Sequence, residues 1–110
     1  MTLFNPSSAN SQQQPAFSNS GTTSDFSLTT ATTTIASDRT AAKNRRGLVL
    51  FNDGTANALF NYGTTISATT FTAELLPGGY FEDTTGWQGP MVARAANNAT
   101  SINVAEIVII

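Results

Sequence analysis

The sequence predicts an all-β fold, a small β-sandwich or jelly-roll-like barrel that follows an extended N-terminal arm. Short apolar runs are separated by turn residues about every eight to twelve positions, which is typical of sandwiches and small barrels. No apolar stripe at helical spacing reaches three turns. The chain has 110 residues and no cysteine. One modest core, without disulfide bonds, therefore has to hold the fold.

Residues 1–30 are expected to form a low-complexity arm outside the core. They are rich in Ser, Thr, Asn and Gln and carry a single charged side chain, that of Asp25. Such a segment buries too little apolar area to offset the entropy lost on ordering, so we expect a neighbouring subunit to hold it. A loose tail is the alternative. The apolar side chains expected to anchor the arm on a partner are those of Phe4, Phe17, Phe26 and Leu28.

Residues 31–46 are expected to contain a strand and a basic linker. The β-branched run over residues 29–35 favours an extended conformation at a sheet edge. The polar stretch that follows, residues 36–46, leads into the main body as a loop or a single helical turn. It holds four of the five basic residues of the chain, Arg39, Lys43, Arg45 and Arg46.

Residues 47–110 are expected to be the β-sandwich domain. Leu48 to Phe51 are apolar without alternation, which predicts a central strand covered on both faces, and residues 52–54 supply the turn that ends it. The next strand, over residues 58–62, has one buried and one mixed face.

The remaining strands are also bounded by turn residues. A strand over residues 71–75 ends at the turn of residues 77–79, a short strand follows at residues 80–81, and another covers residues 91–93. In the last segment, five alternate residues share one face: Ile102, Val104, Glu106, Val108 and Ile110. Because its end is apolar on both faces, we expect this strand to be paired inside a sheet or across a subunit boundary.

Composition argues against an enzyme. Histidine is absent, which removes the commonest general base and metal ligand, and no cofactor motif occurs. Glu82 and Asp83 could combine with another acid as a glycosidase pair or a calcium site, but adjacent strand residues point to opposite faces, which disfavours both. A net charge of -2 disfavours nucleic-acid binding. We also expect neither a signal peptide nor membrane insertion.

Several short motifs carry a resemblance to a known group of proteins. They are R-R-G-L-V-L-F-N-D-G-T at residues 45–55, L-P-G-G at residues 76–79 and W-Q-G-P-M-V-A-R-A at residues 87–95, followed by N-N-A-T-S-I-N-V-A-E-I. In this order of strands and turns, residues 45–110 resemble small β-sandwich virion proteins of bacteriophages, of the capsid decoration or cement type. The resemblance implies a compact sandwich attached to a capsid or a tail.

The expected function is therefore that of a structural virion protein on the capsid surface. Its arm and β-domain would bind subunits of the major capsid protein, and a homo-oligomer, trimer or dimer, is expected. The basic cluster of residues 39–46 would dock on an acidic patch of the major capsid protein, or on packaged nucleic acid if it faces inward. Alternatively, it is a solvated loop that keeps the next strand soluble. Trp87 would anchor a partner, or else cap the end of the core.

Two other functions are compatible with the sequence. One is a structural component of the tail, neck or baseplate with the same fold. The other is a carbohydrate-binding module that uses Trp87 and Tyr80 as stacking residues.

Overall fold

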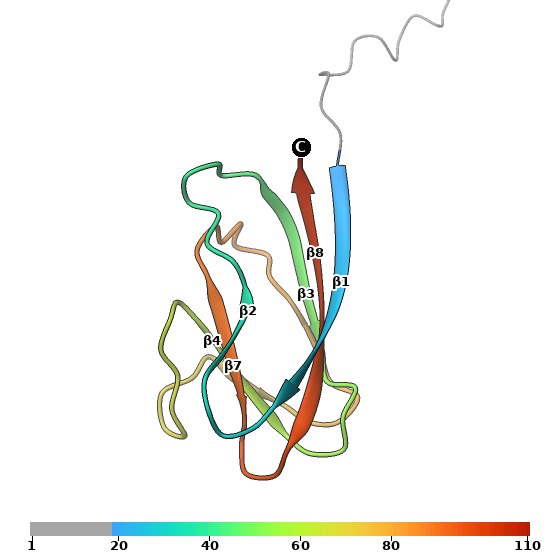
Figure 1. Cartoon of the computed structure of the whole chain (residues 1–110), viewed down its shortest axis with the longest axis vertical. Helices are drawn as coiled ribbons and strands as arrows, with labels where there is room; N and C mark the ends of the chain where they lie inside the picture. Colours follow the sequence, from blue (N-terminus) through green and yellow to red (C-terminus); the bar gives the residue numbers. More distant parts are fainter. Residues whose placement is uncertain (1–18) are drawn as a thin grey trace, which may run out of the picture.

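In a computed structural model, which describes residues 19–110, the chain forms eight β-strands in two four-stranded sheets. The pairings between these strands are all antiparallel. Figure 1 shows the two sheets packed face to face. The predicted all-β sandwich is confirmed. Across residues 19–110, no helix has the length and apolarity needed to cross a bilayer.

The first sheet, sheet A, has the strand order β1-β8-β3-β6. Its strands are β1 (Asn19–Leu28), β8 (Thr100–Ile109), β3 (Arg45–Phe51) and β6 (Tyr80–Glu82). The two longest strands, β1 and β8, pair in an unbroken register from Asn19 opposite Ile109 to Leu28 opposite Thr100. The terminal apolar strand is thus paired on both sides inside a sheet, as one of the two predicted arrangements requires.

The second sheet, sheet B, has the strand order β2-β7-β4-β5. Its strands are β2 (Thr33–Ala36), β7 (Met91–Ala95), β4 (Ala58–Tyr62) and β5 (Ala73–Leu75). Only β4 and β5 are both consecutive in the sequence and neighbours in a sheet. Almost every connection therefore crosses from one sheet to the other.

The core lies between the sheets and is built from the alternate residues that each strand turns inward. Phe60 of β4 is fully buried, and its ring centroid lies 4.6 Å from that of Phe81 of β6. This contact joins the two sheets. The other inward side chains include Leu28, Leu48, Leu50, Met91, Ile102 and Val104.

The segment Asn19–Leu28, which the sequence analysis assigned to the arm, is strand β1 of sheet A. Leu28 is 1% exposed and belongs to the core. Phe26 is partly buried and packs against that core. This strand could not be recognised from an apolar pattern in the sequence, because its other inward residues, such as Thr22 and Ser24, are polar. The sandwich therefore includes Asn19–Leu28 and does not begin at residue 47.

Strand β3 also differs from the prediction, because it is covered on one face only. Leu48 and Leu50 are buried in the core, whereas Phe51 is 42% exposed on the opposite face. The apolar run was therefore wrongly interpreted as a strand buried on both sides. Its second apolar face points away from sheet B and is available for other contacts.

Candidate interaction surfaces

The outer face of sheet A, on the side away from sheet B, carries an apolar stripe. The register places Tyr80 beside Phe51, Val49 beside Ala105, and Ile107 between Gly47 and Gly21. We call Tyr80, Phe51, Val49, Ala105 and Ile107 the outer stripe. Three of them are substantially exposed: Tyr80 by 69%, Ile107 by 44% and Phe51 by 42%. Contiguous exposed apolar side chains of this kind mark contact surfaces.

Three carboxylates border the outer stripe, those of Asp25, Asp53 and Glu82. Ser101 donates a hydrogen bond of 2.6 Å to Asp53 Oδ1 and thereby lowers the pKa of Asp53. The hydrogen bond and the charge of Asp53 raise the pKa of the exposed Asp25 carboxyl. In residues 19–110, no three acidic side chains are grouped closely enough to hold a metal ion. The outer stripe thus has an acidic border that would attract basic groups.

An ion-pair network lies inside the molecule at the inward face of β8. Glu106 Oε2 accepts hydrogen bonds from Nε of Arg45 at 2.7 Å and of Arg39 at 3.1 Å. Glu106 Oε1 accepts a third bond, 2.9 Å long, from Arg39 Nη2. The hydrogen bonds and charges of these two arginines lower the pKa of Glu106, against the effect of burial. The network joins the β2–β3 loop to sheet A.

Arg45 also binds two loops through backbone carbonyls. Its guanidinium donates to the carbonyls of Trp87 and Gly89 in the β6–β7 loop, at 3.0 and 2.8 Å, and to that of Ser37. The Arg45 side chain is only 2% exposed. The prediction that Arg45 docks on a partner is therefore wrong, because all its polar groups are directed to the interior.

The rest of the predicted basic cluster is divided between two roles. Arg39 is held by Glu106 and its side chain is 32% exposed. Lys43 and Arg46 are exposed at the end of the molecule where β3 begins. Lys43 has a positive φ of 52°, in a loop closed by a hydrogen bond from its own N–H to the Arg39 carbonyl. Of the four basic residues predicted to dock, Lys43 and Arg46 are therefore the two classed as exposed.

Trp87 is packed into the β6–β7 loop. Its Nε1 donates a 2.9 Å hydrogen bond to the Pro90 carbonyl, and its ring meets that of Tyr62 edge-on, with 5.3 Å between centroids. Gly89 lies against the indole, since a Cβ there would come within 2.8 Å of Cε2. These contacts fit a Trp87 that caps the end of the core. They do not leave its ring free to stack on a ligand.

Asp83 organises the same loop. It accepts hydrogen bonds from the Tyr62 hydroxyl at 2.7 Å and from the backbone N–H of Trp87 at 3.0 Å. Burial raises the pKa of Asp83, but the bonds from Thr85, Tyr62 and Trp87 lower it by more. Burial and the bond to Asp83 raise the pKa of Tyr62 to about 12.

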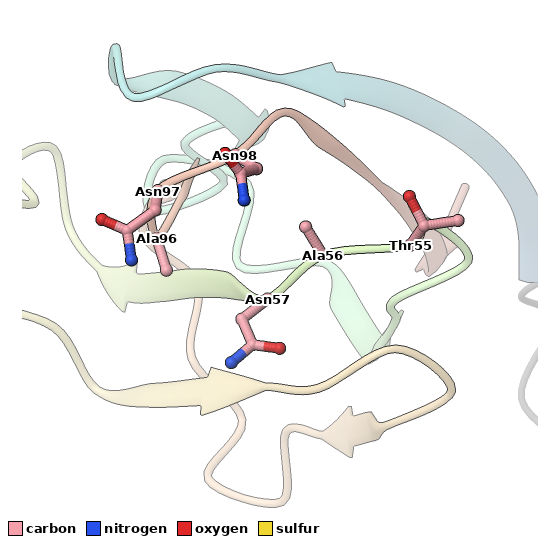
Figure 2. Close-up of a pocket in the computed structure, with 6 residues that line it drawn as sticks. All are labelled: Thr55, Ala56, Asn57, Ala96, Asn97 and Asn98. Atoms are coloured by element: carbon pink, nitrogen blue, oxygen red, sulfur yellow. The ribbon is translucent and has the colours of Figure 1, made fainter.

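Two shallow hollows are present in the described part of the chain. One, of about 280 Å³, lies between the 55–57 loop and the 96–98 turn and is lined by amides and small side chains (Figure 2). The other, of about 250 Å³, lies between β1 and β2 with Glu106 at its base. Because Glu106 is already paired with two arginines, the second hollow offers no free charge to a ligand.

The remaining predicted anchors, Phe4 and Phe17, lie outside the described residues. Sequence analysis missed the outer stripe, although the apolar residues on both faces of β3 and of the end of β8 were visible. The missing information was which face of each strand meets sheet B. The chain matches no protein family, no curated protein and no solved structure with which it was compared.

Proposed function

We propose that this protein is a structural component of a bacteriophage particle that binds coat-protein subunits through the outer face of sheet A. The observation that carries the proposal is the outer stripe with its acidic border. The order of strands and turns, which resembles that of small virion proteins, also supports a structural role in a phage particle. Decoration of the capsid surface is the first expectation, and a place in the tail, neck or baseplate is the second.

The chemistry of the proposed site is burial of apolar surface assisted by charge. Tyr80 and Phe51 lie next to each other on neighbouring strands, so a partner side chain that packs on one contacts both. Asp53 and Glu82 would pair with basic groups at the rim, where charges mainly guide association. A repeated coat lattice would multiply such individually weak contacts.

Co-sedimentation with emptied, undecorated capsids of the source virus tests this proposal. The intact chain should bind at a fixed ratio, whereas the double variant Phe51→Ser/Tyr80→Ser should lose most of its binding. Leu76→Ser is the matched control, because Leu76 is a 61% exposed apolar residue in a turn outside sheet A. Equal binding of the double variant and the wild type would overturn the proposed site.

A carbohydrate-binding function is the third candidate, from a different class, and is favoured by the exposed ring of Tyr80 beside Phe51. Aromatic faces of this kind stack on sugar rings. Trp87, which was predicted to stack on a sugar together with Tyr80, lies in a different part of the molecule, in the β6–β7 loop. A glycan array probed with the wild type and the double variant separates the two functions. Glycan binding that is lost in the double variant, together with no binding to capsids, would favour this candidate.

A further inference from the structure

Strand β1 has an edge that no other described strand covers. It pairs with β8 along one side, over all ten of its residues, and it is the first strand in the order of sheet A. In Figure 1, β1 runs along one border of the sandwich. The opposite border, β6, has only three residues. Sheet A therefore has one long edge and one short edge.

The register identifies the backbone groups on this edge. The N–H of Ile109 donates to the Asn44 carbonyl, so the odd-numbered residues of β8 direct their backbone groups toward β3. The even-numbered residues of β8 then bond to their partners in β1, which are also even-numbered. The remaining residues of β1 direct N–H and C=O away from the sheet: Asn19, Gly21, Thr23, Asp25 and Ser27.

This edge lacks the features that usually prevent strand pairing. Natural edge strands are short, or carry lysine, proline or a bulge. β1 has ten residues, contains neither lysine nor proline, and shows no break in its register. Its only charged side chain is that of Asp25. The edge is therefore suited to accept another strand.

The edge is also complementary to a second copy of itself. When two β1 strands pair antiparallel about Thr23, Asn19 faces Ser27, Gly21 faces Asp25, and Thr23 faces Thr23 of the other copy. All five outward residues of each strand are used, and five residue pairs with two bonds each make ten backbone hydrogen bonds. Facing threonines form a favourable cross-strand pair.

The distribution of charge favours this register. Asp25 faces a glycine, so its carboxylate meets no opposing side chain. The two Asp25 residues lie four positions apart along the strands, about 13 Å, which exceeds the screening length of about 8 Å at physiological salt. A shift by two positions would place Asp25 opposite Asn19 in one direction and opposite Thr23 in the other.

The register also accounts for Gly21. Its φ is not positive, and a Cβ there would meet nothing closer than Ile107 Cγ1 at 3.9 Å. The fold of one chain therefore does not require glycine at this position, although glycine weakens a strand interior. A glycine within a strand often marks the close approach of another backbone.

We propose that two copies of the chain pair through β1, antiparallel and centred on Thr23, so that the two A sheets become one continuous sheet of eight strands. The pairing places Asn19 of each copy beside Ser27 of the other.

Single-cysteine variants test the register directly, because the natural chain has no cysteine. Facing residues of a hydrogen-bonded antiparallel pair have Cα atoms about 5.5 Å apart, within the range of a disulfide bond. Under mild oxidation Thr23→Cys should give a covalent dimer. Ser27→Cys is the matched control on the same edge, and its two copies would lie about 26 Å apart. Equal cross-linking of the two variants would overturn the proposed register.

Sedimentation of the intact chain tests the interface. The wild type should show a mass twice that of the 11.5 kDa chain at high concentration. Thr23→Pro should remain folded by circular dichroism and sediment as a monomer, because the N–H that it removes points to the free edge. A monomeric wild type, or a dimeric Thr23→Pro, would contradict the proposal. None of these measurements involves capsids or glycans, so they are independent of the proposed function.

Discussion

At the scale of single residues, Glu106 shows how a charge can be used inside a small sandwich. It lies on the inward face of β8 and its carboxylate accepts three hydrogen bonds from Arg39 and Arg45. Its side chain is 12% exposed and that of Arg45 is 2% exposed. Removal of one partner would leave a buried charge without compensation, which is costly in a weakly hydrated site.

Glu106→Gln should lower the free energy of unfolding by about 3 kcal/mol, because it leaves the Arg45 guanidinium buried without its counter-charge. Urea unfolding followed by circular dichroism measures this change. Glu82→Gln is the control: Glu82 is an exposed glutamate of β6 and its loss should change stability by no more than about 0.5 kcal/mol. Similar losses in both variants would show that the network does not stabilise the fold.

The difference in stability between the wild type and Glu106→Gln should also depend on pH. The hydrogen bonds from Arg39 and the charge of both arginines lower the pKa of Glu106 in the folded state. The stabilisation is therefore complete above the ordinary glutamate pKa of about 4.3 and is lost as the pH falls through the lower pKa of the folded protein. The difference in stability between wild type and Glu106→Gln should shrink on acidification. A difference that stays constant with pH would contradict this assignment.

The arginines also show that the burial and the ion-pair partner of a residue cannot be read from the sequence. Arg45 and Arg46 are adjacent, yet Arg45 is buried and Arg46 is exposed. Neighbouring strand residues point to opposite faces. The buried partner, Glu106, is 61 residues away from Arg45 in the sequence. Sequence reasoning could find the basic residues but could not pair them.

At the scale of elements, the turn after β3 depends on one asparagine and one glycine. Asn52 is fully buried; its Nδ2 donates to the carbonyls of Ala56 and Leu75, and its Oδ1 accepts from the N–H of Gly54. A Cβ on Gly54 would clash with Thr100 and would lie 2.6 Å from the backbone nitrogen of Ser101. The turn is thus fitted tightly against the start of β8.

Gly54→Ala should therefore destabilise the protein by about 2 kcal/mol through overpacking. Gly47→Ala serves as the control, because a Cβ at Gly47 would come no closer than 3.8 Å to Ile107. It should be neutral or slightly stabilising, since alanine is less flexible than glycine in the unfolded chain. Thermal unfolding of the two variants measures the difference, and a reversed order of stability would refute the clash.

Most elements of the body were predictable because turn residues separate them. The strand over residues 58–62 was predicted with the bounds of β4, and the turn after Leu75 was placed correctly. β1 was missed for a physical reason: it is an edge strand whose outer face meets no other layer and whose inner face is apolar only at Phe26 and Leu28. A strand that buries so little apolar surface gives little pattern to detect.

At the scale of the whole molecule, the position of β1 changes where the chain can be shortened. Deletion of residues 1–18 should leave the thermal unfolding midpoint nearly unchanged, since it keeps all eight described strands and the core between them. Deletion of residues 1–30 should abolish cooperative unfolding, because it removes Leu28 from the core and leaves β8 unpaired along one side. Circular dichroism during heating measures both. Cooperative unfolding of the shorter chain would contradict the role given to β1.

The central place of β8 also determines the order in which the molecule is completed during synthesis. Strands β2, β4, β5 and β7, which form sheet B, all precede β8 in the chain and so leave the exit tunnel before it. β1 has to wait for β8, the last strand, and the intervening chain is most of the protein. Contacts between such distant segments form slowly. On the ribosome, β1 of a nascent chain should therefore stay accessible to proteases until β8 has left the exit tunnel.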